Sequence, residues 1–228
     1  KRRLLQLGEE SWRVKTTGML RLKDIENVKK NNLKKLITKY QFDFSKPFIL
    51  VTFHPVTIEL KDLKKQIFSI IKAIKLSKIN AVITYPNSDA NFNLIINNFK
   101  KKLNQKKKYI FIKNLGEENY YTLMKNAKFM LGNSSSGIVE SASFNLPVIN
   151  IGSRQEGKLK PKNIINADYS VTGIVNAIKK CKKKSFLQKI KKLKNPYKPK
   201  VNAHKIAKII LNLKANDKLL RKKFIDIK

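Results

Sequence analysis

The segment at 132–140 is rich in serine and glycine, and its residue types are suited to holding a phosphate group. It follows the apolar run 129–131 and opens onto apolar residues with helical spacing, so it lies between a predicted strand and a predicted helix. The first turn of a helix exposes backbone N–H groups at the positive end of the helix dipole, where small side chains let an anion approach. Glu140 follows about one turn later, within reach of a sugar hydroxyl beside such a phosphate. The alternative is a Ser/Asn helix cap that binds no ligand.

Three more polar side chains follow predicted strands. His54 is one of two histidines and precedes a proline, Asn87 lies in the turn 85–90, and Arg154 stands in a segment otherwise poor in arginine. Each has a simpler interpretation. His54 could be a histidine whose hydrogen bonds are satisfied at a strand end, Asn87 part of an Asx-type turn, and Arg154 a surface arginine. A guanidinium at this place can also neutralise a diphosphate that a helix N-terminus holds.

Strand-like and helix-like runs alternate along the chain, which predicts a parallel sheet covered by helices on both faces, a doubly wound, Rossmann-like α/β fold. Ligands of such sheets bind beyond the carboxyl ends of the strands, so residues that directly follow strands are candidates for function. The predicted strands are 47–53, 81–85, 109–112, 128–131 and 147–151. The predicted helices are 24–41, 60–76, 92–103, 120–127, 136–145, a further one around 174–178, and 206–213.

The predicted sheet edge brings together a guanidinium, a helix N-terminus, a carboxylate and an imidazole. This combination suits a nucleoside-diphosphate sugar. No cluster of Cys and His residues predicts a metal site, and Ser135 lacks the Gly-x-Ser-x-Gly pattern of serine hydrolases. We therefore expect a nucleotide-sugar site that uses no metal and no cofactor.

The charge of the chain favours a different partner. Lys and Arg number 51 against 15 Asp and Glu, a formal net charge of +36, which is typical of proteins that bind nucleic acid or anionic membranes. The excess is almost all lysine, spread along the chain, whereas arginine, the residue for bidentate phosphate and base contacts, is scarce. We interpret the charge as compositional bias and expect no nucleic-acid partner; a basic nucleic-acid-binding module stays open as a less favoured alternative.

Cys181 is the single cysteine, so no intramolecular disulfide can form and a reducing compartment fits. No apolar run approaches the roughly 18 residues of a membrane helix, and no signal-like segment follows the basic start. We expect a cytoplasmic protein without a membrane partner.

The first 23 residues do not continue the alternation. A short helix, a break at 8–10, a small strand at 13–17 and Gly18 are typical of the end of a preceding domain and a hinge. We predict that 1–23 end an N-terminal domain, that 24–213 form a nucleotide-binding domain, and that 214–228 are a charged tail. The start without methionine, in the middle of a pattern, favours a fragment.

At these segments the chain resembles the hydrolysing UDP-N-acetylglucosamine 2-epimerases, especially the branch that makes N-acylmannosamine-type sugars for sialic and legionaminic acids. The stretches that carry the resemblance are Gln6–Val14, Thr52–Thr57, Tyr85–Ala90, Gly132–Ala142 and Pro147–Gln155. Two departures stand out: Asn91 replaces a glycine frequent in the family, and the Asn-Pro-Tyr at 195–197 continues with Lys-Pro-Lys instead of small, acidic residues.

The resemblance implies two Rossmann-like domains of the glycosyltransferase-B type with substrate between them, of which this chain is the second domain and the end of the first. It also implies a homo-oligomer when the protein is full length. The implied catalytic residue is His54, at the reacting end near the departing UDP. The implied contacts to the UDP-sugar substrate are Ser134, Ser135 and Gly137 with the diphosphate, Glu140 with the ribose, Asn87 with the nucleotide and Arg154 with the phosphates.

The reaction implied by the resemblance eliminates UDP across C1–C2 of the sugar to give a glycal, to which water adds to yield the 2-epimer. The carboxylate base that removes the C2 proton lies in the family's first domain, so we expect these 228 residues alone to be inactive. The alternative enzyme is a sugar-nucleotide-dependent glycosyltransferase of the same domain type, which would transfer the sugar to an acceptor.

Overall fold

The computed structural model describes residues 1–28 and 33–226, which divide into two compact units. One unit combines Lys1–Glu26 with Pro196–Lys228, and the other is Asn27–Asn195. The larger unit carries every candidate site residue. The predicted domains 1–23, 24–213 and 214–228 stay a prediction about the whole protein, although residues 196–213 group here with the N-terminal segment.

The larger unit is built on a six-stranded sheet in the order β3-β2-β1-β4-β5-β6, with every neighbouring pair parallel. The strands are β1 (Phe48–Thr52), β2 (Asn80–Thr84), β3 (Tyr109–Ile112), β4 (Met130–Gly132), β5 (Val148–Ile151) and β6 (Ile164–Ala167). The order reverses between β1 and β4, which is where doubly wound sheets open a crevice for ligands. The predicted α/β fold class is confirmed, and so are the five predicted strands.

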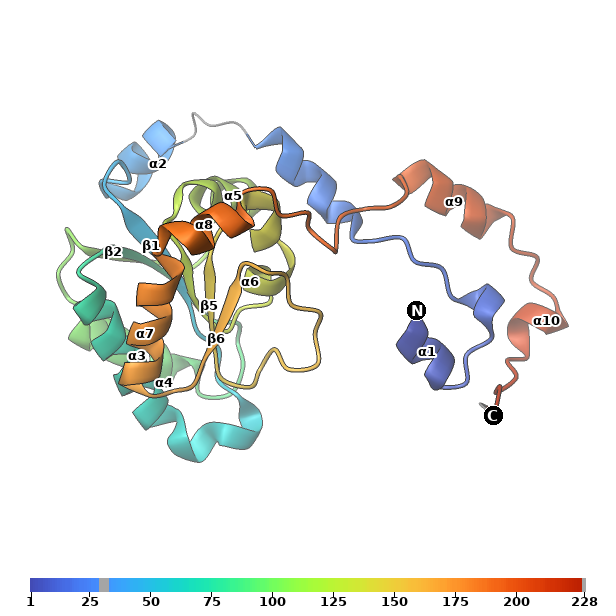
Figure 1. The fold of residues 1–228 in the computed structure, drawn as a ribbon, viewed down its shortest axis with the longest axis horizontal. Coiled ribbons are helices and arrows are strands. Elements are labelled where there is room, and N and C mark those ends of the chain that lie inside the picture. The colour runs from blue at the N-terminus through green and yellow to red at the C-terminus, as the bar shows by residue number, and fades with distance from the viewer. Residues whose placement is uncertain (29–32, 227–228) are drawn as a thin grey trace. The chain divides into compact units, whose positions relative to one another are not determined.

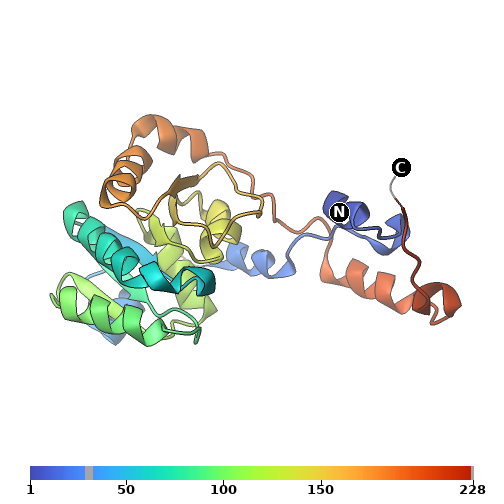
Figure 2. The ribbon, with the colours of Figure 1, turned by 90° about the horizontal axis from the view of Figure 1, so that it is seen from below.

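Helices cover both faces of this sheet (Figures 1 and 2). One layer contains α3, α4 and α7; the other contains α2, α5 and α6 with η5. The helical segments of the larger unit are α2 (Leu33–Tyr40), η4 (Thr57–Asp62), α3 (Leu63–Ser77), α4 (Phe92–Lys102), α5 (Glu117–Asn126), α6 (Ser136–Val139), η5 (Ser141–Phe144), α7 (Val171–Cys181) and α8 (Lys184–Ile190).

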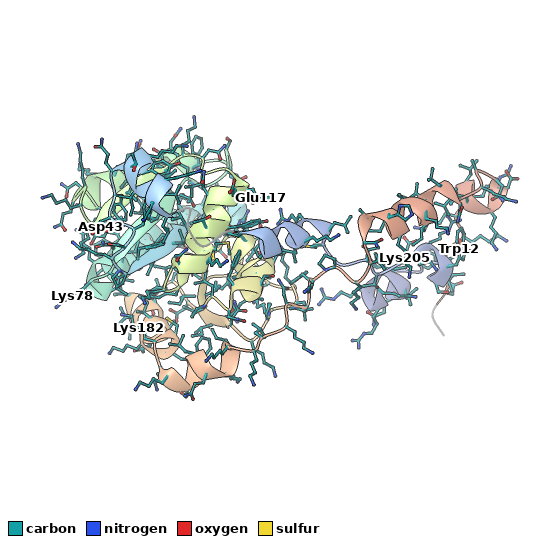
Figure 3. The ribbon with its side chains drawn as sticks, turned by 90° about the horizontal axis from the view of Figure 1, so that it is seen from above. Trp12, Asp43, Lys78, Glu117, Lys182 and Lys205 are labelled. Carbon is teal, nitrogen blue, oxygen red and sulfur yellow. The ribbon has the colours of Figure 1, made fainter. Side chains whose placement is uncertain are left out.

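The core forms because the strands are apolar and the helices are apolar along one stripe. β1, β4 and β5 are buried along their whole length, as expected of central parallel strands covered on both faces. The stripe of α3 that includes Ile67, Ile70 and Ile74 lies at 0–2% exposure against them. Lys78 and Lys182, which directly follow α3 and α7, have exposed side chains (Figure 3).

Three predicted elements were wrong in detail. The small strand at 13–17 is absent, because residues 11–13 form the turn η1 (Ser11–Arg13) and the next residues are irregular. The predicted helix 24–41 divides into η2 (Leu20–Asn27) and α2, and part of that prediction, residues 29–32, lies outside the described residues. The predicted helix 136–145 is α6 followed by the tighter η5.

The structure shows the setting of Asn91, one of the two departures from the resembled family, and of Asn195, where the retained Asn-Pro-Tyr begins. Asn91 adopts φ +65° just before α4, in left-handed backbone that glycine enters without steric cost, and asparagine is among the residues that tolerate it. Asn195 is buried and donates from Nδ2 to Val139 O (2.7 Å) and Ser143 Oγ (2.7 Å). Asn195 therefore ties the end of the larger unit to the segment that follows β4.

The smaller unit joins the beginning and the end of the chain. Arg13 donates to Leu219 O (2.8 Å) and Lys218 O (2.5 Å), and its guanidinium lies 4.3 Å from the centre of the Trp12 ring. Its helices are α1 (Arg2–Gln6), η1, η2, α9 (Ala203–Leu211) and α10 (Asp217–Leu220). The predicted charged tail at 214–228 thus contains a short helix. Among residues 1–28 and 33–226, no helix is long and apolar enough to cross a membrane.

Candidate functional site

Asn133, the residue after β4, connects the carboxyl ends of three strands. Its side chain accepts from His54 N (2.7 Å) and donates to His54 O (2.8 Å), which fixes the residue two positions past β1. Its carbonyl oxygen accepts from Arg154 Nη1 (3.1 Å) and Gln155 Nε2 (2.8 Å), both past β5. Asn133 is fully buried, so these bonds are formed away from water. His54 and Arg154 are therefore held at one edge of the sheet by a shared partner.

His54 is held as a neutral imidazole with a defined tautomer. Its residue is 5% exposed, and its Nδ1 accepts a hydrogen bond from the backbone N–H of Asn87 (3.3 Å). Burial, and to a lesser extent the charge of Arg154, lower the pKa of His54 to about 4, although Asp89, 3.7 Å from Nδ1, acts in the opposite direction. At neutral pH the proton of the ring is therefore on Nε2, which makes that atom a hydrogen-bond donor.

The serine-rich turn continues this edge with a chain of hydroxyl groups. Ser134 Oγ lies 2.9 Å from Ser136 Oγ, which lies 2.7 Å from the hydroxyl of Tyr120 on α5. Ser135 is the N-cap residue of α6 and is exposed. The hydroxyl groups of this turn surround the start of α6, where backbone N–H groups begin to point along the helix.

Glu140 and Gly137 lie on the inner side of the same turn. Glu140 ends α6 and is 4% exposed. Burial raises the pKa of the Tyr120 hydroxyl, and the charge of Glu140 contributes to that rise. Gly137 is buried, and a Cβ there would meet Val148 Cγ1 at 3.0 Å. Gly137 therefore lets α6 pack closely on β5, which brings the turn to the sheet edge.

The structure thus brings several of the predicted residues together, with differences in how they contribute. His54, Asn87 and Arg154 share contacts at one edge, but Asn87 takes part through its backbone, and its side chain is exposed. Ser134 and Glu140 belong to the adjoining turn, in which Ser134 directly follows Asn133 and its Oγ lies 2.9 Å from Ser136 Oγ. Within the described residues, no group of three His, Cys, Asp or Glu side chains could hold a metal ion.

Sequence reasoning missed three residues of this region. Asn133 directly follows a strand, so the same rule that selected His54 would have found it. The sequence gives no indication of Tyr120, because its position on α5 beside Ser136 depends on how the helix packs. Glu59, seven residues past β1, accepts hydrogen bonds from residues that follow two other strands, and no local sequence pattern indicates it.

Residues 1–211 match the protein family described as UDP-N-acetylglucosamine 2-epimerase. The chain belongs to this family. A curated relative from Campylobacter jejuni, "GDP/UDP-N,N'-diacetylbacillosamine 2-epimerase (hydrolyzing)", is 40% identical over 231 residues, which cover 100% of this chain. The chain spans 59% of the length of that relative.

Solved structures with the same fold include members of the epimerase family. The Staphylococcus aureus MnaA–UDP co-structure has a TM-score of 0.71 at 21% identity, covering 99% of this chain and 59% of the other. The Neisseria meningitidis UDP-GlcNAc 2-epimerase bound to UDP-GlcNAc has a TM-score of 0.70 at 18% identity, covering 96% and 58%. At these identities the likeness confirms the fold of this epimerase-family chain.

Proposed function

We propose that the chain carries the UDP-binding half of a hydrolysing UDP-N-acetylglucosamine 2-epimerase, and that its substrate is a UDP-linked 2-acetamido sugar. The observation that carries the proposal is that Asn133, beside the serine-rich turn, accepts hydrogen bonds from both His54 and Arg154. The chain in which this occurs belongs to the epimerase family. A guanidinium and a neutral N–H donor that meet where strands β1, β4 and β5 end match the β-phosphate of a nucleoside diphosphate.

Each predicted site residue then has a role that its setting supports. Arg154 neutralises the phosphates, Ser134 and Ser135 bond them from the turn, and Gly137 allows α6 to come close enough for its first N–H groups to contribute. Glu140 accepts hydrogen bonds from the ribose hydroxyls. Asn87 contacts the nucleotide from the turn after β2 while its N–H keeps the His54 ring in place.

His54 acts at the leaving group. In the proposed reaction the C2–H and C1–O bonds of the sugar break, a C1–C2 double bond forms, and UDP departs with the electrons of the C1–O bond. A hydrogen bond from Nε2–H to the β-phosphate stabilises the charge that develops on that oxygen. Water then adds across the double bond, with the proton returning to C2 from the opposite face and the hydroxyl joining C1, to give the free 2-epimer.

The base that takes the C2 proton is proposed to lie outside these 228 residues, as the resemblance implies. The chain spans 59% of the length of its Campylobacter relative, which is consistent with that proposal. We also propose that the N-acyl sugar belongs to sialic or legionaminic acid biosynthesis, because the same relative is named for a diacetylated 2-acetamido sugar. Self-association of the whole protein stays a prediction.

Calorimetry with the 228-residue chain tests the proposed function. We expect micromolar binding of UDP, much weaker binding of ADP, and loss of UDP binding in Glu140→Ala. Incubation with UDP-GlcNAc is expected to release no UDP. Robust release would contradict the division of the catalytic groups between this chain and another part of the protein. If the chain instead binds nucleic acid and not UDP, and its affinity for nucleic acid falls steeply as the salt concentration rises, the basic nucleic-acid-binding module is favoured.

The pKa of His54 provides a further prediction. We expect UDP to raise the pKa of His54 from its value of about 4, because the anionic diphosphate favours the charged imidazolium. By linkage, the affinity for UDP increases as the pH falls through the pKa of the complex, and it levels off below the pKa of the free protein. NMR titration of the imidazole resonances with and without UDP measures both values.

A His54 resonance that titrates at one pH in both states would place the diphosphate away from the imidazole and refute its assignment to the leaving group.

A further inference from the structure

Glu59 is a half-buried carboxylate that gathers hydrogen-bond donors from three other elements. Its Oε2 accepts from the Tyr169 hydroxyl (2.6 Å), past β6, and from Gln66 Nε2 (3.1 Å) on α3. Its Oε1 accepts from Ser153 Oγ, past β5. Glu59 itself lies in η4, just beyond the loop that carries His54.

The surrounding backbone is shaped to allow these contacts. The chain leaves helical geometry at Glu59 (φ −116°, ψ 17°), and its N–H bonds to Val56 O (2.9 Å). Gly152 adopts φ +71°, and a Cβ there would come closer than 3.0 Å to the Tyr169 hydroxyl. The absence of a side chain at 152 therefore makes room for the tyrosine to reach Glu59 directly beside Ser153.

These contacts add a second connection between two loops of the candidate site. Asn133 joins His54 to Arg154 on the strand side. On the other side, Ser153, which precedes Arg154 in the chain, bonds Glu59, which follows His54 by five residues. The loop after β1 and the loop after β5 are thus joined twice, once at the strand ends and once through the carboxylate.

Glu59 is ionised at neutral pH. Burial alone would raise its pKa, but the hydrogen bonds from Ser153, Tyr169 and Gln66 outweigh burial and lower it below the usual value. A carboxylate that is hydrogen-bonded to Ser153, the residue before Arg154, weakens the attraction for an anionic ligand. The charge of Glu59 therefore disfavours UDP binding, whereas its hydrogen bonds favour it. Whether a substitution of Glu59 raises or lowers the affinity for UDP shows which of the two effects is larger.

We propose that Glu59 is a positioning residue of the diphosphate site, because it fixes the loop of His54 against the loop of Arg154 so that both reach the β-phosphate. The inference rests on the proposed function, since it concerns the geometry of the same UDP site. Glu59 acts through Ser153 and Tyr169 and does not contact the ligand.

The test compares UDP with UMP, which lacks the β-phosphate, in calorimetry with the 228-residue chain well below its unfolding temperature. In Glu59→Ala we expect UDP affinity to fall about tenfold and the ratio of UDP to UMP affinity to fall with it, because the two groups for the β-phosphate lose their alignment. Tyr169→Phe, which removes one donor, is expected to lower the same ratio by a smaller factor. Glu156→Ala is the matched control: this exposed carboxylate lies on the same loop past β5, and its removal is expected to leave the ratio unchanged.

The outcomes separate the two proposals. If the unchanged chain binds no UDP, the proposed function fails and the role of Glu59 falls with it. If the unchanged chain binds UDP and Glu59→Ala binds it equally well or more tightly, only the positioning role is refuted, since the charge then outweighs the hydrogen bonds. A purely structural role would lower the unfolding temperature and leave the affinity ratio of the folded chain unchanged. Glu59→Gln, which keeps the size of the side chain and one acceptor oxygen, gives the same comparison should the alanine variant not fold.

Discussion

We expect Arg154→Ala to lower the affinity of the chain for UDP by about 30- to 150-fold. The guanidinium has five N–H donors, of which one nitrogen bonds Asn133 O, and its planar fork suits a phosphate. Hydrogen bonds to charged groups are worth about 1.5–3 kcal/mol, and we expect a loss in the upper part of this range, about 2–3 kcal/mol. At 1.4 kcal/mol for each factor of ten, that loss gives the stated change, measured by calorimetry.

Two variants control that measurement. Arg154→Lys keeps the charge but not the fork, so its affinity for UDP is expected between those of the unchanged chain and the alanine variant. Lys158→Ala removes an exposed cation from the same loop, and we expect less than a threefold change. Equal losses in Lys158→Ala and Arg154→Ala would show that UDP responds to net charge alone and would contradict a specific contact.

Arg154→Ala can also be tested in the absence of ligand, through the pKa of His54. Since the charge of Arg154 contributes to the low pKa of His54, Arg154→Ala is expected to raise the pKa of His54 in the free chain. The proximity of the two side chains is thereby tested independently of UDP.

The fold could be predicted from the sequence because its central strands are buried on both faces. Such strands are short, uninterrupted apolar runs, as in Phe48–Thr52, and the helices between them show apolar residues at helical spacing. β6 (Ile164–Ala167) lies at the edge of the sheet, is only partly buried, and contains Asn166. Its four residues therefore carry too little periodicity to stand out from the loop before them.

The site could be predicted in part, for a related physical reason. Parallel strands end at a common edge, so His54 and Arg154 could be brought together by topology alone. The hydrogen bonds that join their loops are those of Asn133 with His54 and Arg154 and that of Ser153 with Glu59. Such bonds across the sheet depend on side-chain geometry that leaves no periodic pattern in the sequence. Gly137 illustrates the limit: the sequence suggested a phosphate contact, whereas its buried position against Val148 also serves the packing of α6.

The turn that holds Asn133 depends on the glycine before it. Gly132 ends β4 at φ +137°, a conformation that side chains rarely adopt, and it pairs with Thr52 across the sheet. A Cβ at 132 would lie closer than 3.0 Å to the carbonyl oxygen of Thr52, a backbone atom of a central strand that cannot move aside cheaply. The N–H of Asn133 bonds to that same oxygen (3.1 Å).

Gly132→Ala is therefore expected to destabilise the chain by more than about 4 kcal/mol, a large part of the roughly 5–15 kcal/mol that folded domains have. Denaturant unfolding followed by circular dichroism measures the loss. Gly116→Ala is the matched control, because Gly116 also has positive φ (+70°) but a Cβ there meets nothing within 4 Å. The control is expected to cost about 1–3 kcal/mol, the strain of the backbone alone. Equal costs at the two positions would mean that β4 can move away from β1, and that the close approach at Thr52 does not hold Asn133 in place.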